Sequence, residues 1–236
     1  MKHKIADIYD DVDPRDVPVY GLTEAARYLN IPASTLRSWT VGQRQGRKRA
    51  FKPVIEIAEP QTRMLSFGNA CEAHVCDALR RTHQVPLQRI RGAIDILRRL
   101  YPRTPHPLLD HQFATSGVDV FVDEIGKLIN LSSGGQTAMR ECLNLYLARV
   151  EYDQSGVASK LFPFTRSEHP SESPRVVVLD PRVLFGRPVI VNTRIATSVI
   201  YERWAAGESV EALAEDYNRP LPEIEEALRC EHRSAA

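Results

Sequence analysis

The twenty residues at positions 20–39, YGLTEAARYLNIPASTLRSW, constrain the fold more than any other part of this chain of 236 residues. Thr23 is a candidate N-cap for a first short helix, Asn30 can end it, and Pro32 suits the first turn of a second helix. Small or apolar residues recur at helical spacing on both sides of that break: Ala25, Ala26, Leu29, Leu36 and Trp39. The pattern predicts two short helices joined by a tight turn, a helix-turn-helix.

The polar side of the second helix carries residue types that contact DNA bases or phosphates: Ser34, Thr35, Arg37 and Ser38. An arginine can reach the O6 and N7 atoms of guanine in the major groove, and Ser or Thr can bond bases or phosphates. The following stretch, VGQRQGRKRAFKPVIEIAE, predicts a β-hairpin or wing that continues into a strand-like FKPVIEIA. Its cations are expected to neutralise phosphates: Arg44, Arg47, Lys48 and Arg49. The alternative is a solvated basic loop beside a helical hairpin that binds nothing, but its position after a helix-turn-helix favours DNA.

The net charge of +1 is the sum of two halves of opposite charge. Residues 1–110 hold 18 Lys and Arg against 12 Asp and Glu, whereas residues 111–236 hold 13 against 18. A basic front half suits nucleic acid, and an acidic back half suits a protein partner. The chain has no apolar run long enough to span a membrane, and its first twenty residues lack the apolar core of a signal peptide, so we expect a cytoplasmic protein.

The middle of the chain predicts a mixed region that we expect to form a homodimer. Two amphipathic helices fit residues 67–101, a β-hairpin turning at Gly126 fits residues 118–131, and a strand fits VASKLFPF at 157–164. A further helix is marked by apolar residues at helical spacing: Met139, Leu143, Tyr146 and Val150. A dimer would match two DNA half-sites about one helical turn apart, and the alternative is an ordinary monomeric core.

The fold class expected is therefore α+β, mainly α. Five parts follow one another: an acidic lead-in at 1–18, a winged helix-turn-helix at 19–66, the central α+β region at 67–164, a linker at 165–174, and a C-terminal β-hairpin with three helices at 175–230. In the last part Thr197 or Ser198 starts the first helix, Gly207 stops it, Ser209 starts the second and Pro222 opens the third. Tyr201 and Trp204 are expected in its core. No repeat of fixed period is visible, although two small helical units flank the middle.

Two stretches resemble known families. Residues 19–66 resemble the winged helix-turn-helix of MerR-type regulators through GLTEAARYLNIPASTLRSW. Residues 175–230 resemble the domain-of-unknown-function 433 family, a small antitoxin-like module, through Asp180-Pro181, GRPVI at 186–190, NTRI at 192–195, AGES at 206–209 and Tyr217. That family usually has glycine where this chain has Phe185 and Asn192, and Asn tolerates a left-handed backbone better than most residues.

The combination of the two units resembles VapB-type antitoxins of bacterial toxin–antitoxin pairs. The resemblance implies a cognate PIN-domain ribonuclease toxin encoded beside the chain, double-stranded operator DNA, and repression of its own operon. The candidate toxin-binding residues are Arg187, Asn192 and Arg194. The arginines would face an acidic nuclease site, or they are turn residues that bond local carbonyls or Asp180. The acidic stretch VEALAEDYNRPLPEIEEAL argues against a second DNA reader.

Two other functions remain open at this point. The chain could be a stand-alone MerR-like transcriptional regulator whose C-terminal half dimerises or senses a ligand, or a neutralising module with a degenerate DNA reader as its scaffold. We expect no enzyme and no cofactor, because the sequence has no P-loop, dinucleotide fingerprint, nucleophile elbow or zinc-protease motif. We also expect no metal: Cys71, His74 and Cys76 could form half a site, but both cysteines fit the buried face of a helix better.

Overall fold

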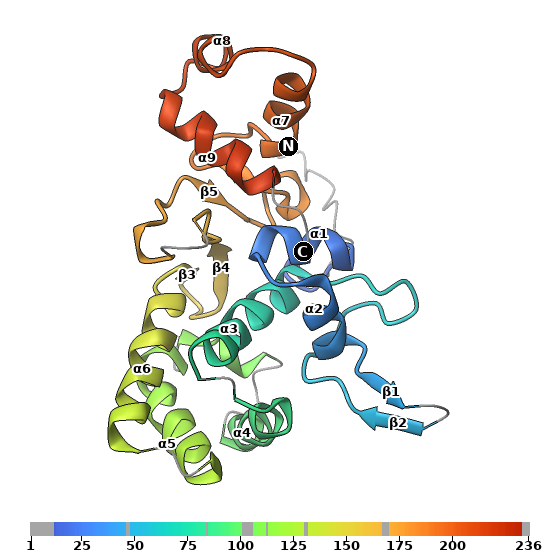
Figure 1. Ribbon diagram of the computed structural model, residues 1–236, viewed down its shortest axis with the longest axis vertical. Helices are drawn as coiled ribbons and strands as arrows, with labels where there is room; N and C mark the ends of the chain where they lie inside the picture. Colours follow the sequence, from blue (N-terminus) through green and yellow to red (C-terminus); the bar gives the residue numbers. More distant parts are fainter. Residues whose placement is uncertain are drawn as a thin grey trace, which may run out of the picture.

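The computed structural model describes residues 12–45, 48–83, 85–100, 106–111, 113–129, 132–166 and 170–232. Helices dominate this part of the chain, and its strands pair two by two in short antiparallel sheets. The predicted mainly α class is confirmed. In Figure 1 the C-terminal helices occupy one end of the long axis and the central helices the other, with the first two helices between them.

The front of the chain forms the predicted helix-turn-helix and hairpin: α1 (Leu22–Leu29), α2 (Ala33–Thr40), β1 (Gln43–Gln45) and β2 (Lys48–Phe51). The predicted N-cap Thr23 is wrong, because Gly21 caps α1 and its N–H donates to the Glu24 carboxylate (3.4 Å). The predicted strand through FKPVIEIA ends at Phe51. Beyond it the N–H groups of Val54 and Ile55 both donate to the Trp39 carbonyl, so this segment lies against α2.

The central region consists of α3 (Phe67–His83), α4 (Leu87–Leu100), α5 (Val118–Ile129), α6 (Ser133–Leu147), β3 (Val150–Tyr152) and β4 (Ala158–Leu161). The helices at 67–101 and the strand in VASKLFPF are confirmed. Val150 begins β3 and does not belong to α6, which ends at Leu147.

The hairpin predicted at 118–131 is wrong, because its residues form α5. Val118, Phe121, Val122 and Ile125 are buried at helical spacing. Gly126 lies where α5 meets α6, and a Cβ there would come within 2.7 Å of the Gln136 Nε2. This glycine permits a close helix contact and is not a turn residue.

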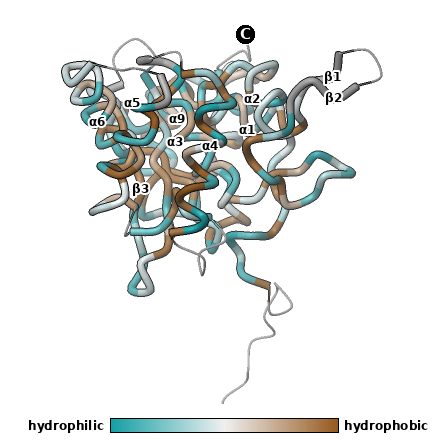
Figure 2. The backbone as a smooth tube through the Cα atoms, turned by 90° about the horizontal axis from the view of Figure 1, so that it is seen from below, coloured by the Kyte–Doolittle hydropathy of each residue, from teal (hydrophilic) through white to brown (hydrophobic). Residues whose placement is uncertain are grey.

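Helix α3 is the centre of the core. Figure 2 shows it between α6 on one side and α1 with α2 on the other, and all of its residues from Phe67 to Leu79 are buried. Cys71 and Cys76 lie on it as buried free thiols, and burial raises the pKa of each. Their predicted role as small buried side chains is confirmed.

The C-terminal part contains β5 (Val177–Val178), β6 (Val189–Ile190), α7 (Thr197–Ala205), α8 (Val210–Asp216) and α9 (Leu221–Glu231). Its helices enclose a separate small core of buried residues: Ile190, Ile200, Leu213, Ile224 and Ala227. Ser209 caps α8 as predicted, and Pro222 stands in the first turn of α9. The expectation for Trp204 is wrong, because it is one of the exposed large side chains.

Arg149 ties the segment after the central region to the core. Its buried guanidinium donates to the carbonyls of Phe162, Pro163, Ser173 and Pro174 at 2.8–3.2 Å. Burial lowers the pKa of Arg149 to about 10. Within the described residues of the stretch 165–174, Thr165 and Ser173 are buried. No helix among the described residues is long and apolar enough to cross a membrane.

Candidate nucleic-acid interface and the C-terminal module

The turn between α1 and α2 is fixed by two backbone hydrogen bonds and one proline. Asn30 adopts a left-handed conformation (φ 55°), and its N–H donates to the Arg27 carbonyl at 3.2 Å. The N–H of Ile31 donates to the Ala26 carbonyl at 2.9 Å. Pro32 then takes an extended conformation and caps α2. This arrangement satisfies the last carbonyls of α1 and lets α2 start at once.

The helix α2 buries one side and exposes the other. Leu36 and Trp39 are 0% and 1% exposed and pack in the main core. On the opposite side Ser34 and Arg37 are exposed, with Ser38 half-buried between them and Thr35 half-buried at the margin. The structure therefore brings together the four residues predicted on α2, and a helix that presents such a polar face can enter a major groove.

The wing is present as a two-stranded antiparallel ribbon. Arg44 and Arg49 are directly opposed across β1 and β2, and Gln45 is opposite Lys48 at the tip. Figure 1 shows this ribbon projecting away from the helices beside α2. Arg47, the fourth predicted cation of the wing, lies outside the described residues. The backbone thus carries Arg44, Lys48 and Arg49 out from the body on the α2 side of the molecule.

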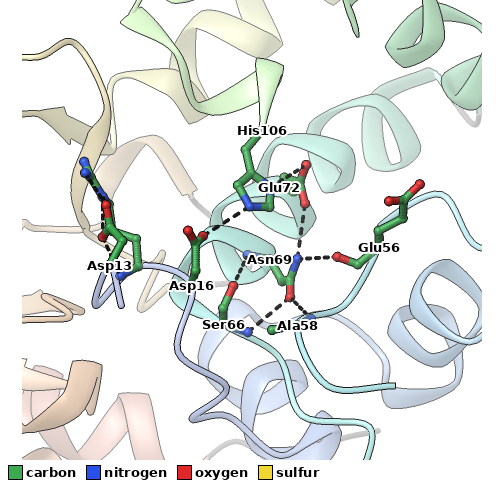
Figure 3. A network of polar contacts seen from close by, with 9 residues as sticks. Asp13, Asp16, Glu56, Ala58, Ser66, Asn69, Glu72 and His106 are labelled. Atoms are coloured by element: carbon green, nitrogen blue, oxygen red, sulfur yellow. Dashed lines mark hydrogen bonds and ion pairs between the residues drawn. The ribbon is translucent and has the colours of Figure 1, made fainter. Parts of the chain in front are cut away.

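Asn69, at the start of α3, fastens the segment that returns from the wing. Its Oδ1 accepts the N–H groups of Ala58 (2.9 Å) and Ser66 (3.2 Å), and its Nδ2 donates to the Glu56 carbonyl (2.8 Å). Figure 3 shows Asn69 at the centre of these contacts. Arg91 of α4 adds hydrogen bonds to the carbonyls of Lys52 and Pro53. The base of the wing is therefore attached to both α3 and α4.

His106 joins the lead-in to α3 in the same network. Its Nδ1 lies 3.1 Å from the Glu72 carboxylate and its Nε2 lies 3.4 Å from the Asp16 carboxylate. Burial opposes protonation of the ring, but the hydrogen bond to Glu72 and the charge of Asp16 outweigh it, so the pKa of His106 is raised. A cleft of about 410 Å³ adjoins these side chains.

The turn between α8 and α9 repeats the backbone angles of the turn between α1 and α2. Asn218 is left-handed (φ 49°), as Asn30 is (φ 55°). Pro220 caps α9 with φ −55° and ψ 138°, and Pro32 caps α2 with φ −53° and ψ 131°. The equivalent positions are 188 residues apart. In this sense of two helices joined by the same turn, α8 and α9 form a second helix-turn-helix unit.

Hydrogen bonds and burial follow the same register. The N–H of Arg219 donates to the Ala214 carbonyl at 2.9 Å, as that of Ile31 donates to Ala26. Ile224 occupies the position equivalent to Leu36, and both are 0% exposed. The sequence signal for this repeated turn is the Asn-x-Pro motif at 30–32 and 218–220. Reasoning from the sequence missed it because it looked for repeats at a fixed period, and two copies alone do not define a period.

The positions predicted to contact DNA in the front unit and their equivalents in the C-terminal unit differ in charge. Ser34, Thr35 and Arg37 of α2 correspond to Pro222, Glu223 and Glu225 of α9. Carboxylates at those positions would repel DNA phosphates.

The three residues predicted to bind a toxin occupy two places in the module. Asn192 and Arg194 are exposed in the turn between β6 and α7, and Asn192 is left-handed (φ 60°), as its resemblance to a glycine position suggested. Arg187 is exposed before β6, at the other end of that short strand. Neither Arg187 nor Arg194 has an ion pair with another described residue.

Two contacts that sequence reasoning missed join the C-terminal module to the front unit. The Tyr20 hydroxyl donates to the Gly186 carbonyl at 2.7 Å, and both residues are buried. Arg27 of α1 lies 3.0 Å from the carboxylate of Glu231 at the end of α9, which also accepts a hydrogen bond from Thr197 at 2.5 Å. No local sequence pattern indicates such contacts between distant residues.

The comparisons with known proteins cover both units. Residues 18–94 match the family model "Putative DNA-binding HTH domain", and residues 177–229 match "Protein of unknown function (DUF433)". The predicted resemblance of these two regions is confirmed.

Similar whole proteins come from Mycobacterium tuberculosis. The chain is 29% identical over 232 residues to "Putative antitoxin VapB45", covering 90% of this chain and 93% of that protein. It is 26% identical over 228 residues to "Uncharacterized protein Rv2308", covering 90% of each. The crystal structure of Rv2018 aligns with a TM-score of 0.68 and 27% identity over 90% of this chain and 98% of that one. The chain is therefore similar over most of its length to a protein named as an antitoxin.

Proposed function

We propose that this chain is the antitoxin of a type II toxin–antitoxin pair. Its front unit binds operator DNA and represses its own operon, and its C-terminal module binds and neutralises a cognate PIN-domain ribonuclease. The observation that carries the proposal is the similarity to a protein named "Putative antitoxin VapB45", which extends over 90% of this chain and so spans both helix-turn-helix units. The polar exposed face of α2 supports the DNA-binding half of the proposal.

In this proposal α2 lies in a major groove. Ser34, Thr35, Arg37 and Ser38 contact base edges and nearby phosphates, since they share the side of α2 that faces away from the core. The wing residues Arg44, Arg47, Lys48 and Arg49 neutralise phosphates, which fixes the register of α2 on the duplex. A homodimer formed through the central region would place two such units on two half-sites.

The C-terminal module meets the nuclease through Arg187, Asn192 and Arg194. Nucleases that use divalent metal ions hold them with clustered carboxylates. An arginine inserted among those carboxylates would pair with them and replace the charge of the metal. The exposure of Arg187 and Arg194 supports this role, because neither has to leave an ion pair within the described chain to reach a partner.

The first test is co-purification from the native host, followed by expression of the partner alone. We expect a small PIN-domain nuclease that arrests growth by itself, and growth restored when the full chain is co-expressed. DNA from upstream of the gene pair should bind the chain and the complex in a gel-shift assay, and a reporter under that DNA should be repressed. If the chain purifies alone, or the nearest nuclease leaves growth unaffected, the antitoxin function is wrong.

A further inference from the structure

A row of three polar side chains connects a titratable ring to the base of the wing. Asn69 holds the segment that returns from the wing, because its Oδ1 accepts the Ala58 N–H and its Nδ2 donates to the Glu56 carbonyl at 2.8 Å. The same Nδ2 also donates to the Glu72 carboxylate at 3.4 Å. The other oxygen of Glu72 lies 3.1 Å from the Nδ1 of His106, and Figure 3 shows the three side chains in this order.

Glu72 is a buried carboxylate whose charge depends on a counterion. It is 4% exposed, and its ion pair within the described residues is the one with His106. A buried carboxylate that loses its partner is strongly destabilised and needs stronger hydrogen bonds from the donors that remain. The Nδ2 of Asn69 is such a donor. If it moves toward Glu72, it moves away from the Glu56 carbonyl and loosens the segment behind the wing.

The surroundings of His106 favour the charged ring. Asp16 of the lead-in lies 3.4 Å from its Nε2. Glu56, from the segment behind the wing, and Arg98 of α4 line the same cleft and lie 3.7 Å from each other. The ring packs on Gly68 of α3, where a Cβ would come within 3.2 Å of the Nε2. Burial opposes protonation, but the neighbouring carboxylates outweigh it, so the pKa of His106 is raised.

The wing has a second attachment that does not involve this row. The carbonyl of Trp39 and the side chain of Arg91 hold residues 52–55 through hydrogen bonds to their backbone. These contacts should keep the segment folded when Asn69 moves, so we expect a shift of the wing and not unfolding. A hydrogen bond weakens steeply outside its normal distance and angle, so a small shift is enough to separate the cations of the wing from DNA phosphates.

We propose that His106 and Glu72 are positioning residues for the wing: with His106 charged they leave Asn69 on the returning segment, and with His106 neutral the wing shifts and loses contacts with phosphates. This inference rests on the DNA-binding half of the proposed function and adds a regulation of it, in which acidification strengthens DNA binding. The sign follows from the ion pair, which is fully formed below pH 6.5 and is lost as the pH rises through the raised pKa of His106.

The first test measures the affinity of the full-length chain for a duplex from upstream of its gene, by fluorescence anisotropy at pH 6.0 and 8.5. The wild type should bind about fivefold or more tightly at the lower pH. His106→Gln should lose this difference and bind weakly at both pH values. His111→Gln is the matched control, because His111 is exposed beside Tyr152 of the central hairpin, and it should keep the wild-type difference.

Glu72→Gln separates the positioning role from a merely structural one. Without the buried charge there is nothing for His106 to neutralise, so this variant should bind at both pH values as tightly as the wild type does at pH 6.0. The His106→Gln/Glu72→Gln double variant should regain tight binding for the same reason. A structural defect would instead add to the first one.

The salt dependence of binding reports the position of the wing. Each lost phosphate contact lowers the slope of log affinity against log salt by about 0.9. The wing carries Arg44, Lys48 and Arg49 on its described strands, so the slope of His106→Gln should be smaller by about 1–3 than that of the wild type at pH 6.0. A variant that is only less stable would keep the wild-type slope, and circular dichroism shows whether each variant is folded.

The outcomes distinguish this inference from the function on which it rests. If the wild type binds no upstream duplex at either pH, the DNA-binding half of the proposed function fails, and this inference fails with it. If the wild type binds and His106→Gln keeps its pH dependence and salt slope, only this inference is wrong. If His106→Gln does not fold, Glu72→Gln decides, and a wild-type pH dependence in that variant would overturn the proposal.

Discussion

A methyl group added at Gly186 should weaken the packing of the C-terminal module against the front unit. In a Gly186→Ala variant the new Cβ would lie 2.3 Å from the Tyr20 hydroxyl oxygen and 3.2 Å from the ring carbon that bears it. Tyr20 is 1% exposed, so the ring must push against the core to move away. Such overpacking costs about 1–3 kcal/mol, and losing the Tyr20 hydrogen bond costs about 1 kcal/mol more.

The backbone adds a second cost, because Gly186 has φ 82°. An L-residue in the left-handed region costs about 1–2 kcal/mol. Together these effects should lower the free energy of unfolding by about 3–6 kcal/mol. Gly207→Ala isolates the backbone part, because Gly207 has φ 105° and a Cβ there would meet nothing within 4 Å. That control should lose only about 1–2 kcal/mol.

Urea unfolding of the full chain, followed by circular dichroism, measures Gly186→Ala, Gly207→Ala, Tyr20→Phe and the Tyr20→Phe/Gly186→Ala double variant. Removing the hydroxyl removes the closest contact, so the double variant should lose less stability than the two single losses add up to, with a coupling of about 1 kcal/mol. If Gly186→Ala unfolds at the same urea concentration as Gly207→Ala, the ring of Tyr20 does not press on this turn and the tight docking of the two units is wrong.

Three further substitutions test other contacts. Arg37→Ala should weaken operator binding by about 1–3 kcal/mol in fluorescence anisotropy. Its melting temperature should be unchanged because Arg37 is exposed. If the variant binds every DNA tested as tightly as the wild type does, α2 is not the recognition helix. The raised pKa of His106 means that its ion pairs stabilise the fold fully below pH 6.5 and that this contribution fades as the pH rises through the raised pKa. His106→Gln should therefore lower the melting temperature at pH 5.5 more than at pH 8.5, and an equal loss at both would show that the ring is not charged in the fold. Arg149→Lys should cost about 2–3 kcal/mol in thermal unfolding, because one ammonium cannot reach the four carbonyls that the guanidinium binds; a wild-type melting temperature would contradict that role.

Local chemistry made the helix boundaries of the two terminal units predictable. Asn30 tolerates the left-handed angle that ends α1, and Pro32 cannot continue α1 but can precede α2. Asn192 takes a left-handed angle for the same reason. The polar side of α2 followed from the spacing of Leu36 and Trp39, and the structure places it where that spacing requires.

Contacts between distant residues decided the rest. Val118, Val120 and Val122 alternate as a strand does, yet α5 is a helix whose side is completed by Phe121 and Ile125 packing in the main core. A short apolar run fits both the helical period and the strand period, so its packing against the rest of the core determines which structure forms.

The two helix-turn-helix units use one backbone geometry with opposite charge, and this accounts for the near-neutral chain. In the front unit the outer side of α2 is left open, with Ser34 and Arg37 exposed. In the C-terminal unit Glu225 lies 3.2 Å from Arg229 of the same helix, while Glu231 at the end of α9 pairs with Arg27 of α1. The helix that would read DNA in the second unit therefore supports the first one, and its carboxylates keep phosphate away from that side. The shared turn with opposite charge therefore supports the proposal that the front unit meets DNA and the C-terminal unit meets a protein.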